Sequence, residues 1–134
     1  VFFAPDGNDQ HVMLHNGYVG IGTITPAEKL SVNGKIRAHE IKVEVTGWPD
    51  YVFEPNYRLQ SLSELDQFIK IHGHLPDMPN ASEAESEGIT LGKFNTLLLK
   101  RLEEQTLHLI EKDKEIAELR DEVAAIKDLL KKLL

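Results

Sequence analysis

The chain has 134 residues, with 15 Lys and Arg against 22 Asp and Glu, which gives a formal net charge of −7. The length is typical of one domain, and the acidic balance argues against binding to nucleic acid. No stretch predicts a membrane span, and the sequence has no Cys for disulfides, thiolate metal sites or a cysteine nucleophile. The N-terminus lacks both a Met and a secretory signal, so we expect a soluble piece of a longer protein.

Residues 11–45 are expected to form short strands separated by tight turns. Asn16-Gly17 and Asn33-Gly34 are dipeptides typical of hairpins or strand reversals. They separate apolar stretches at 11–15, 18–22, 29–32 and 35–45. The glycines at 20 and 22 leave one strand face without side chains, where another backbone can approach closely. Because so few strands bury little apolar surface, we expect this segment to need further copies of itself.

Four aromatic residues gather just after these strands, at Trp48, Tyr51, Phe53 and Tyr57. We expect them to form a small core or a clamp on a later helix. The alternative is a ligand surface of Trp48, Tyr51 and Tyr57 that binds a glycan.

Residues 47–90 also contain signals for two short helices. Ser61-Leu-Ser-Glu64 is a capping box, and the apolar spacing after it predicts a helix that ends at Gly73. Asn80-Ala-Ser-Glu83 is a second capping box, and it begins a short acidic helix that ends at Gly88. The stretch between the helices is expected to be extended, because a residue before Pro is disfavoured in the α region.

His72 and His74 form an H-x-H pair around Gly73. Three copies of the pair around an axis would supply six imidazoles to one metal ion. One such pair is a weak signal, and the helix stop at Gly73 already accounts for the local sequence. We therefore predict no metal and no other cofactor.

The C-terminal segment is predicted to be one long helix, because the 42 residues after Gly92 contain neither Gly nor Pro. With Ile116 at heptad position a, ten of the thirteen a and d positions over 91–134 are apolar, which indicates a coiled coil. The a and d positions, called the seam below, are Leu91, Asn95, Leu98, Leu102, Gln105, Leu109, Lys112, Ile116, Leu119, Val123, Ile126, Leu130 and Leu133. The other 90 residues are too few to cover such a helix, so the seam is expected to bind copies of itself.

The flanking charges favour a parallel coil. In that arrangement position g meets e of the next heptad on the neighbour, and Glu115 would face Arg120 while Glu122 would face Lys127. His108 and Asp113 would meet in the same way. Leu and Ile occur at both a and d, which favours three strands over two.

Two polar residues, Gln105 and Lys112, occupy d positions of the seam. They are expected to set register and oligomeric state, with Lys112 able to extend out of the seam. The alternative is an ion or water held on the axis by a ring of Gln105.

The helix is also apolar outside the seam, at Leu97, Leu99, Leu107 and Ile110. Something must cover this outer face. The preceding residues are the expected cover, with Leu107 and Ile110 as the coil-packing face.

Two other classes of protein fit poorly. A leucine-zipper transcription factor needs a basic helix directly before its heptads, and residues 80–90 contain three Glu and no Lys or Arg. An enzyme needs convergent titratable groups in a pocket, whereas the acids here are scattered. We predict neither DNA binding nor catalysis.

Residues 17–36, GYVGIGTITPAEKLSVNGKI, resemble the G-x-V-G-I-G-T-x-x-P-x-x-K-L-x-V-x-G-x-I repeat of tail-fibre-like proteins of phages and of large surface proteins from Bacteroidetes-type bacteria. Residues 48–53, 73–76 and 88–89 are similar to the C-terminal module that accompanies that repeat. The resemblance implies an α+β fibrous homotrimer. Its parts would be an intertwined β shaft over 1–46, a small α/β module over 47–90 and a parallel trimeric coiled coil over 91–134.

The order of short helix, extended Leu-Pro segment and long coil also resembles, more distantly, the intramolecular chaperone domain that ends endosialidase and other phage fibres. That family cleaves itself with a Ser and a Lys near the start of the domain. Residues 35–42 contain no Ser, so the nucleophile is missing and we predict no self-cleavage.

We therefore expect a non-enzymatic structural terminus that brings together and registers three chains of a fibre or adhesin. Its partners would be two further copies, the upstream part of the same fibre and, in the alternative, a host receptor or glycan bound at this end. The expected location is a virion tail fibre or the bacterial cell surface, without membrane insertion.

Overall fold

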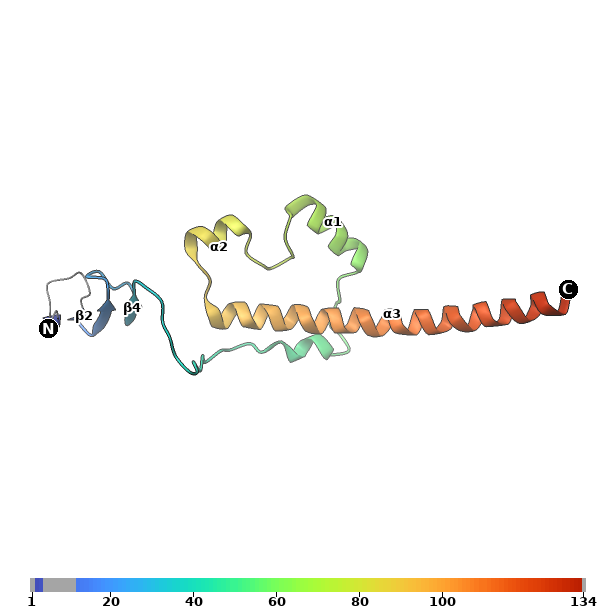
Figure 1. Cartoon of the computed structure of the whole chain (residues 1–134), viewed down its shortest axis with the longest axis horizontal. Coiled ribbons are helices and arrows are strands. Elements are labelled where there is room, and N and C mark those ends of the chain that lie inside the picture. Colours follow the sequence, from blue (N-terminus) through green and yellow to red (C-terminus); the bar gives the residue numbers. More distant parts are fainter. Residues whose placement is uncertain (1, 4–11, 134) are drawn as a thin grey trace. The chain divides into compact units, whose positions relative to one another are not determined.

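A computed structural model describes residues 2–3 and 12–133, and Figure 1 shows their secondary structure. The described chain is mixed α+β, with three α-helices and a small sheet, which confirms the α+β class. It divides into two compact units, Val1–Lys42 and Val43–Leu134. Residues 1, 4–11 and 134 lie outside the described residues, so the expected first and last segments are described only in part. The expected segments over 47–90 and 91–134 fall within the same unit.

The first unit is a sheet of four short strands in the order β1-β2-β3-β4. Its strands are β1 (Phe2–Phe3), β2 (Val12–His15), β3 (Tyr18–Ile21) and β4 (Leu30–Val32). β2 and β3 are antiparallel, and Asn16 (φ 49°) and Gly17 (φ 79°) connect them. Two consecutive residues with positive φ are what a two-residue hairpin of this type requires, so the predicted Asn-Gly turn is confirmed.

The prediction of a second strand reversal at Asn33-Gly34 is wrong, because no strand follows this dipeptide among the described residues. β4 lies parallel to β3, with Val19 N donating to Lys29 O at 2.8 Å and Asn33 N donating to Ile21 O at 2.9 Å. Residues 35–45 form no strand. Their apolar side chains are exposed, Ile36 by 63% and Ile41 by 61%. A strand needs a hydrogen-bonded neighbour, and nothing in the described chain supplies one here.

The glycine-lined face of β3 does allow a close backbone approach, as predicted. Gly20 is buried, and a Cβ atom at this position would collide with the carbonyl oxygen of Thr23. The approaching backbone is therefore the chain's own turn after β3.

The helices of the described chain all lie in the second unit. They are the 3₁₀ helix η1 (Pro49–Phe53), α1 (Leu62–His72), α2 (Ala81–Glu87) and α3 (Leu91–Leu133). Both predicted capping boxes are present, because the side chains of Ser61 and Asn80 accept from the backbone N–H of Glu64 and Glu83. Gly73 ends α1 with φ 73° and so confirms the predicted stop.

The core of this unit is small. Val52, with 1% of its surface exposed, is the one buried hydrophobic residue among those described, and Pro49 beside it is also buried. Both belong to η1, which packs against α3. α3 has 43 residues, roughly 65 Å at about 1.5 Å per residue, and in Figure 1 it runs well past the segments packed on it. None of the described helices is long and apolar enough to cross a membrane.

Candidate functional site

The seam of α3 is open along its whole length. All thirteen a and d residues are exposed in the single chain. The largest values include Leu109 at 64% and Leu102 at 59%, while Ile116 in the next heptad is 46% exposed. Fully burying such a side chain contributes about 1.5–3 kcal/mol, so the seam is a large apolar surface that this chain leaves in water.

The C-terminal part of α3 lacks cover on every side. Each residue from 109 to 133 is exposed. A helix of this length without tertiary contacts is only marginally stable in water, because packing of an apolar face supplies most of a helix's stability. The described part of the chain therefore supplies no packing that would stabilise this part of α3.

The earlier part of α3 is covered on the faces away from the seam. Val43 and Val45 reach Gly92 so closely that their Cγ1 atoms would lie 2.8 Å from an added Cβ. Further along, the backbone carbonyl of Gln60 accepts a hydrogen bond from Nε2 of His108 at 3.0 Å. His108 is 8% exposed. The segment that precedes α1 therefore follows the helix for several turns.

A polar network fastens two segments to the middle of α3. The Tyr57 hydroxyl donates to the Glu104 carboxylate. Arg101 donates from Nη1 to Glu104 at 2.6 Å and from Nη2 to Asp77 Oδ2 at 2.9 Å. It also donates to the carbonyl of Pro76, and Lys100 donates to Asp77 at 3.0 Å. The loop after η1 and the loop after α1 are thus tied to one turn of the helix.

The electrostatics of the network follow from these contacts. The hydrogen bond from Lys100, together with the nearby charges of Lys100 and Arg101, holds the pKa of Asp77 below its usual value. Burial and the hydrogen bond to Glu104 raise the pKa of Tyr57. Tyr57 therefore stays a neutral donor and Asp77 an ionised acceptor, which are the protonation states that the network needs.

The apolar residues outside the seam are covered unevenly. Leu97, Leu99 and Leu107 are half-buried by the chain's own segments. Ile110 remains 48% exposed. The cover that we expected for both Leu107 and Ile110 therefore does not reach Ile110 within one chain.

The aromatic cluster at 48–57 does not form the small core that we expected. Trp48 and Phe53 are each 54% exposed and Tyr51 is 41% exposed. Pro49 and Val52 of η1 are buried in their place, because a 3₁₀ turn presents only part of its surface to the helix. Tyr57 contributes its hydroxyl to the network, and its ring centroid lies 5.9 Å from that of Tyr51.

Gln105 and Lys112, the two polar residues at d positions of the seam, are both exposed. Lys112 donates from Nζ to both carboxylate oxygens of Glu115, at 3.0 and 2.8 Å, and this pairing raises the pKa of Lys112. Its ammonium group is thus directed to position g at the edge of the seam.

The two histidines of the H-x-H pair make local contacts. The His72 ring packs on Phe68 at 4.2 Å between centroids, and the centroids of His72 and His74 are 6.0 Å apart. His74 Nδ1 lies 2.8 Å from the carbonyl oxygen of Leu75. Within the described part of the chain, no three His, Asp or Glu residues are placed to hold a metal ion.

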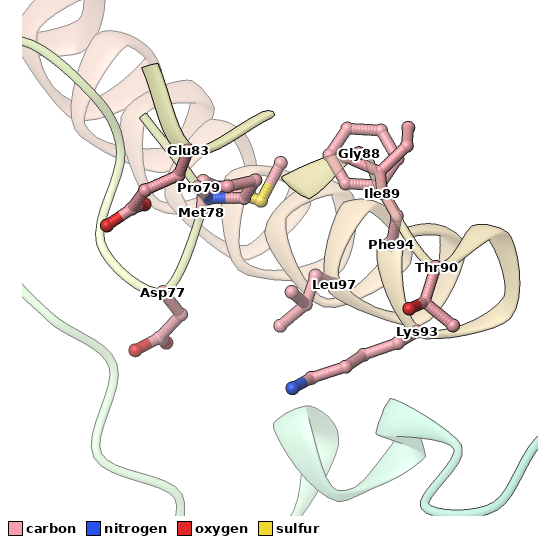
Figure 2. A pocket seen from close by; sticks show the side chains of 10 residues that line it. All are labelled: Asp77, Met78, Pro79, Glu83, Gly88, Ile89, Thr90, Lys93, Phe94 and Leu97. Carbon is pink, nitrogen blue, oxygen red and sulfur yellow. The ribbon is translucent and has the colours of Figure 1, made fainter. Parts of the chain in front are cut away.

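A cavity of about 320 Å³ lies where α2 and the loop before it meet the start of α3. Figure 2 shows Lys93 and Asp77 at this cavity together with a mainly apolar lining. The lining residues are Asp77, Met78, Pro79, Glu83, Gly88, Ile89, Thr90, Lys93, Phe94 and Leu97. Asp77 and Glu83 already serve the network and the α2 cap, so these carboxylates do not converge as an acid–base pair.

A groove of about 350 Å³ separates α1 from α3, and we call it the α1 groove. Leu62 and Leu65 of α1 and Leu75 of the next loop line one side, and α3 lines the other. No residue of α1 is buried. The apolar face of α1 is therefore open toward the groove.

The network and the groove were missed by sequence reasoning. Arg101 and Glu104 are spaced as a helical i, i+3 ion pair, but nothing local indicates that Tyr57 and Asp77 join them. Comparisons with known protein families, curated proteins and solved structures found no match. Among the described residues, the buried carboxylate of Glu104 and the buried ring of His108 are held in structural pairs, and the seam is left exposed.

Proposed function

We propose that this chain is the trimerisation and registration terminus of a fibre or adhesin, and that it acts without catalysis. The observation that carries the proposal is the division of α3 into two faces. Between 97 and 108 the chain covers positions c, f and g, yet every seam residue stays exposed. A protein that folds in this way keeps one heptad face free for copies of itself.

Parallel association of three copies is favoured by the residue pattern. Glu115 and Glu122 at position g would meet Arg120 and Lys127 at position e of a neighbour in the same register. Leu and Ile mixed at a and d favour a trimer over a dimer. Gln105 and Lys112 would act as polar layers that disfavour a shifted register.

The coil would assist folding of the N-terminal segment by raising local concentration. Strand pairing between distant segments or chains is slow, because loop closure or association has to precede the contacts that stabilise it. Once α3 has joined three chains, their N-terminal segments are held together. Residues 35–45, which have no strand partner among the described residues, would then meet two further copies to form the intertwined β shaft.

The location that accords with this role is a virion tail fibre or a bacterial surface protein, with the upstream part of the same chain as the fibre. Support comes from the resemblance of residues 17–36 to the fibre repeat and from the exposed seam.

Light scattering of the purified chain tests the proposal directly. A trimer has three times the 15.1 kDa mass of one chain. A mass of one chain at micromolar concentration would overturn the proposal, and a mass of two chains would overturn the trimeric state.

A second candidate is a receptor-binding tip. It is favoured by the exposure of Trp48, Tyr51 and Phe53, since exposed aromatic rings bind sugars and protein surfaces. Binding of the trimer to a glycan array, and its loss in a Trp48→Ala variant that stays trimeric, would support this candidate. An array without signal would leave the purely structural role.

A further inference from the structure

The α1 groove has an apolar wall and a floor that is part of the seam. Leu62, Leu65 and Leu75 form the wall, and Gln105, Leu109 and Lys112 of α3 belong to the floor. These three floor residues are consecutive d, a and d positions of the heptad. Any helix that packs on the seam at this level must therefore run beside α1.

The charged side chains at the groove are paired, although Nε of Arg101 is buried without a hydrogen-bond partner, and this pairing argues against a small polar ligand. Arg101 is paired with Glu104, His108 with the Gln60 carbonyl and Lys112 with Glu115. What the groove offers is mainly apolar surface on α1, where Leu62 is 46% exposed and no side chain is fully buried. An apolar partner surface fits it.

The chain itself carries an exposed apolar side chain, Ile110, at the level of α3 that forms the groove floor. In a parallel coil, positions g of one helix lie beside positions e of the next heptad on its neighbour. His108 at g would then lie beside Asp113 of the neighbouring copy. Ile110 is at position b, which lies beside position e on the helix surface. It is 48% exposed in its own chain.

Charge favours a second copy as the occupant. C-terminal to the groove, heptad position g carries the acidic residues Glu115 and Glu122, and position e carries the basic residues Arg120 and Lys127. Two copies in parallel register bring these edges together. The same register places Ile110 of one copy level with the groove of the next.

We infer that α1 of each copy clasps the α3 helix of the adjacent copy, with Leu65 packed against that copy's Ile110. The inference rests on the proposed trimer and assigns it a second interface outside the seam. It explains why no residue of α1 is fully buried in its own chain and why Ile110 stays 48% exposed there. Three clasps would link the middle modules around the coil and fix which neighbour each one meets.

Cysteine cross-linking tests the clasp, because the chain has no native Cys. A Leu65→Cys chain and an Ile110→Cys chain, carrying different tags, are co-expressed and oxidised. The expected product is a disulfide-linked pair that contains both tags. Ser63→Cys, on the exposed polar face of α1, replaces Leu65→Cys as a matched control and should yield at least fivefold less product.

A Val123→Cys chain reports on the seam alone, since position a residues of a parallel coil face one another across the axis. Cross-linked Val123→Cys together with no mixed Leu65–Ile110 product would overturn the clasp and leave the trimer intact. Absence of the Val123→Cys product, together with a monomeric mass, would overturn the proposed function itself.

Discussion

The hydroxyl of Tyr57 donates a hydrogen bond to the carboxylate of Glu104, 47 residues further along the chain. Glu104 also pairs with Arg101, which holds Asp77 and the Pro76 carbonyl. One turn of α3 thus anchors two loops. Both anchors lie away from the seam, so the network stabilises the unit without occupying the surface that we propose for association.

The first prediction concerns the seam. Replacing both Ile116 and Val123 by Asp would place charges at two successive a positions, and burying an unpaired charge is very costly. We expect a monomer by light scattering, with lower helicity by circular dichroism. The matched control is Ala117→Asp with Ala124→Asp, which adds the same charges at the adjacent b positions. The control should stay trimeric, and a trimeric seam variant would contradict the coiled-coil assignment.

The second prediction concerns Tyr57. Tyr57→Phe removes only the hydroxyl and leaves the buried Glu104 with one donor fewer. A lost hydrogen bond to a partly buried charged group costs about 1.5–3 kcal/mol, so the urea midpoint should fall. Tyr51→Phe is the control, because that ring is more exposed and its hydroxyl makes no hydrogen bond within the described chain. Equal midpoints for the two variants would argue against the network.

The third prediction concerns pH. The pKa of Asp77 is lower in the folded chain than in the unfolded chain, so its contribution to stability is present above the unfolded value, about 3.9, and is lost as the pH falls through the folded value. Asp77→Asn removes this dependence while keeping a residue that tolerates the left-handed backbone found here, φ 59°. We expect the variant to melt lower than the wild type at pH 7, with a smaller decrease in melting temperature between pH 6 and about pH 3.

Thermal melts at fixed chain concentration measure this effect, since the stability of an oligomer depends on concentration. The capping carboxylate of Glu64 also has a lowered pKa, so the Asp77→Asn variant should retain part of the acid sensitivity. Parallel melting curves for wild type and variant over the whole range would contradict the role of Asp77.

The fourth prediction concerns Gly92. An added side chain would meet Val43 and Val45 at 2.8 Å, closer than ordinary contact, so Gly92→Leu should separate the extended segment from α3. Leu is the better helix former by about 0.5–1 kcal/mol, yet we expect a net loss of stability in urea unfolding. Lys93→Leu, at the next and exposed position, is the control. If Gly92→Leu were as stable as this control, the close packing would be disproved.

Short-range features could be predicted from the sequence. The capping boxes at Ser61 and Asn80, the stop at Gly73 and the hairpin at Asn16-Gly17 all depend on residues within a few positions of one another. The extent of α3 follows from the absence of Gly and Pro after Gly92. Neighbouring residues decide such features, so tertiary contacts had little to alter.

Long-range features depended on the tertiary structure. The parallel pairing of β4 with β3, the missing strand over 35–45 and the pairing of Tyr57 with Glu104 each depend on which distant backbone or side chain is available as a partner. The heptad pattern by itself determined that α3 has an apolar seam. Only the tertiary structure decided that the chain covers the other faces of α3 up to residue 108 and leaves the seam open, because covering requires segments whose positions no local pattern encodes.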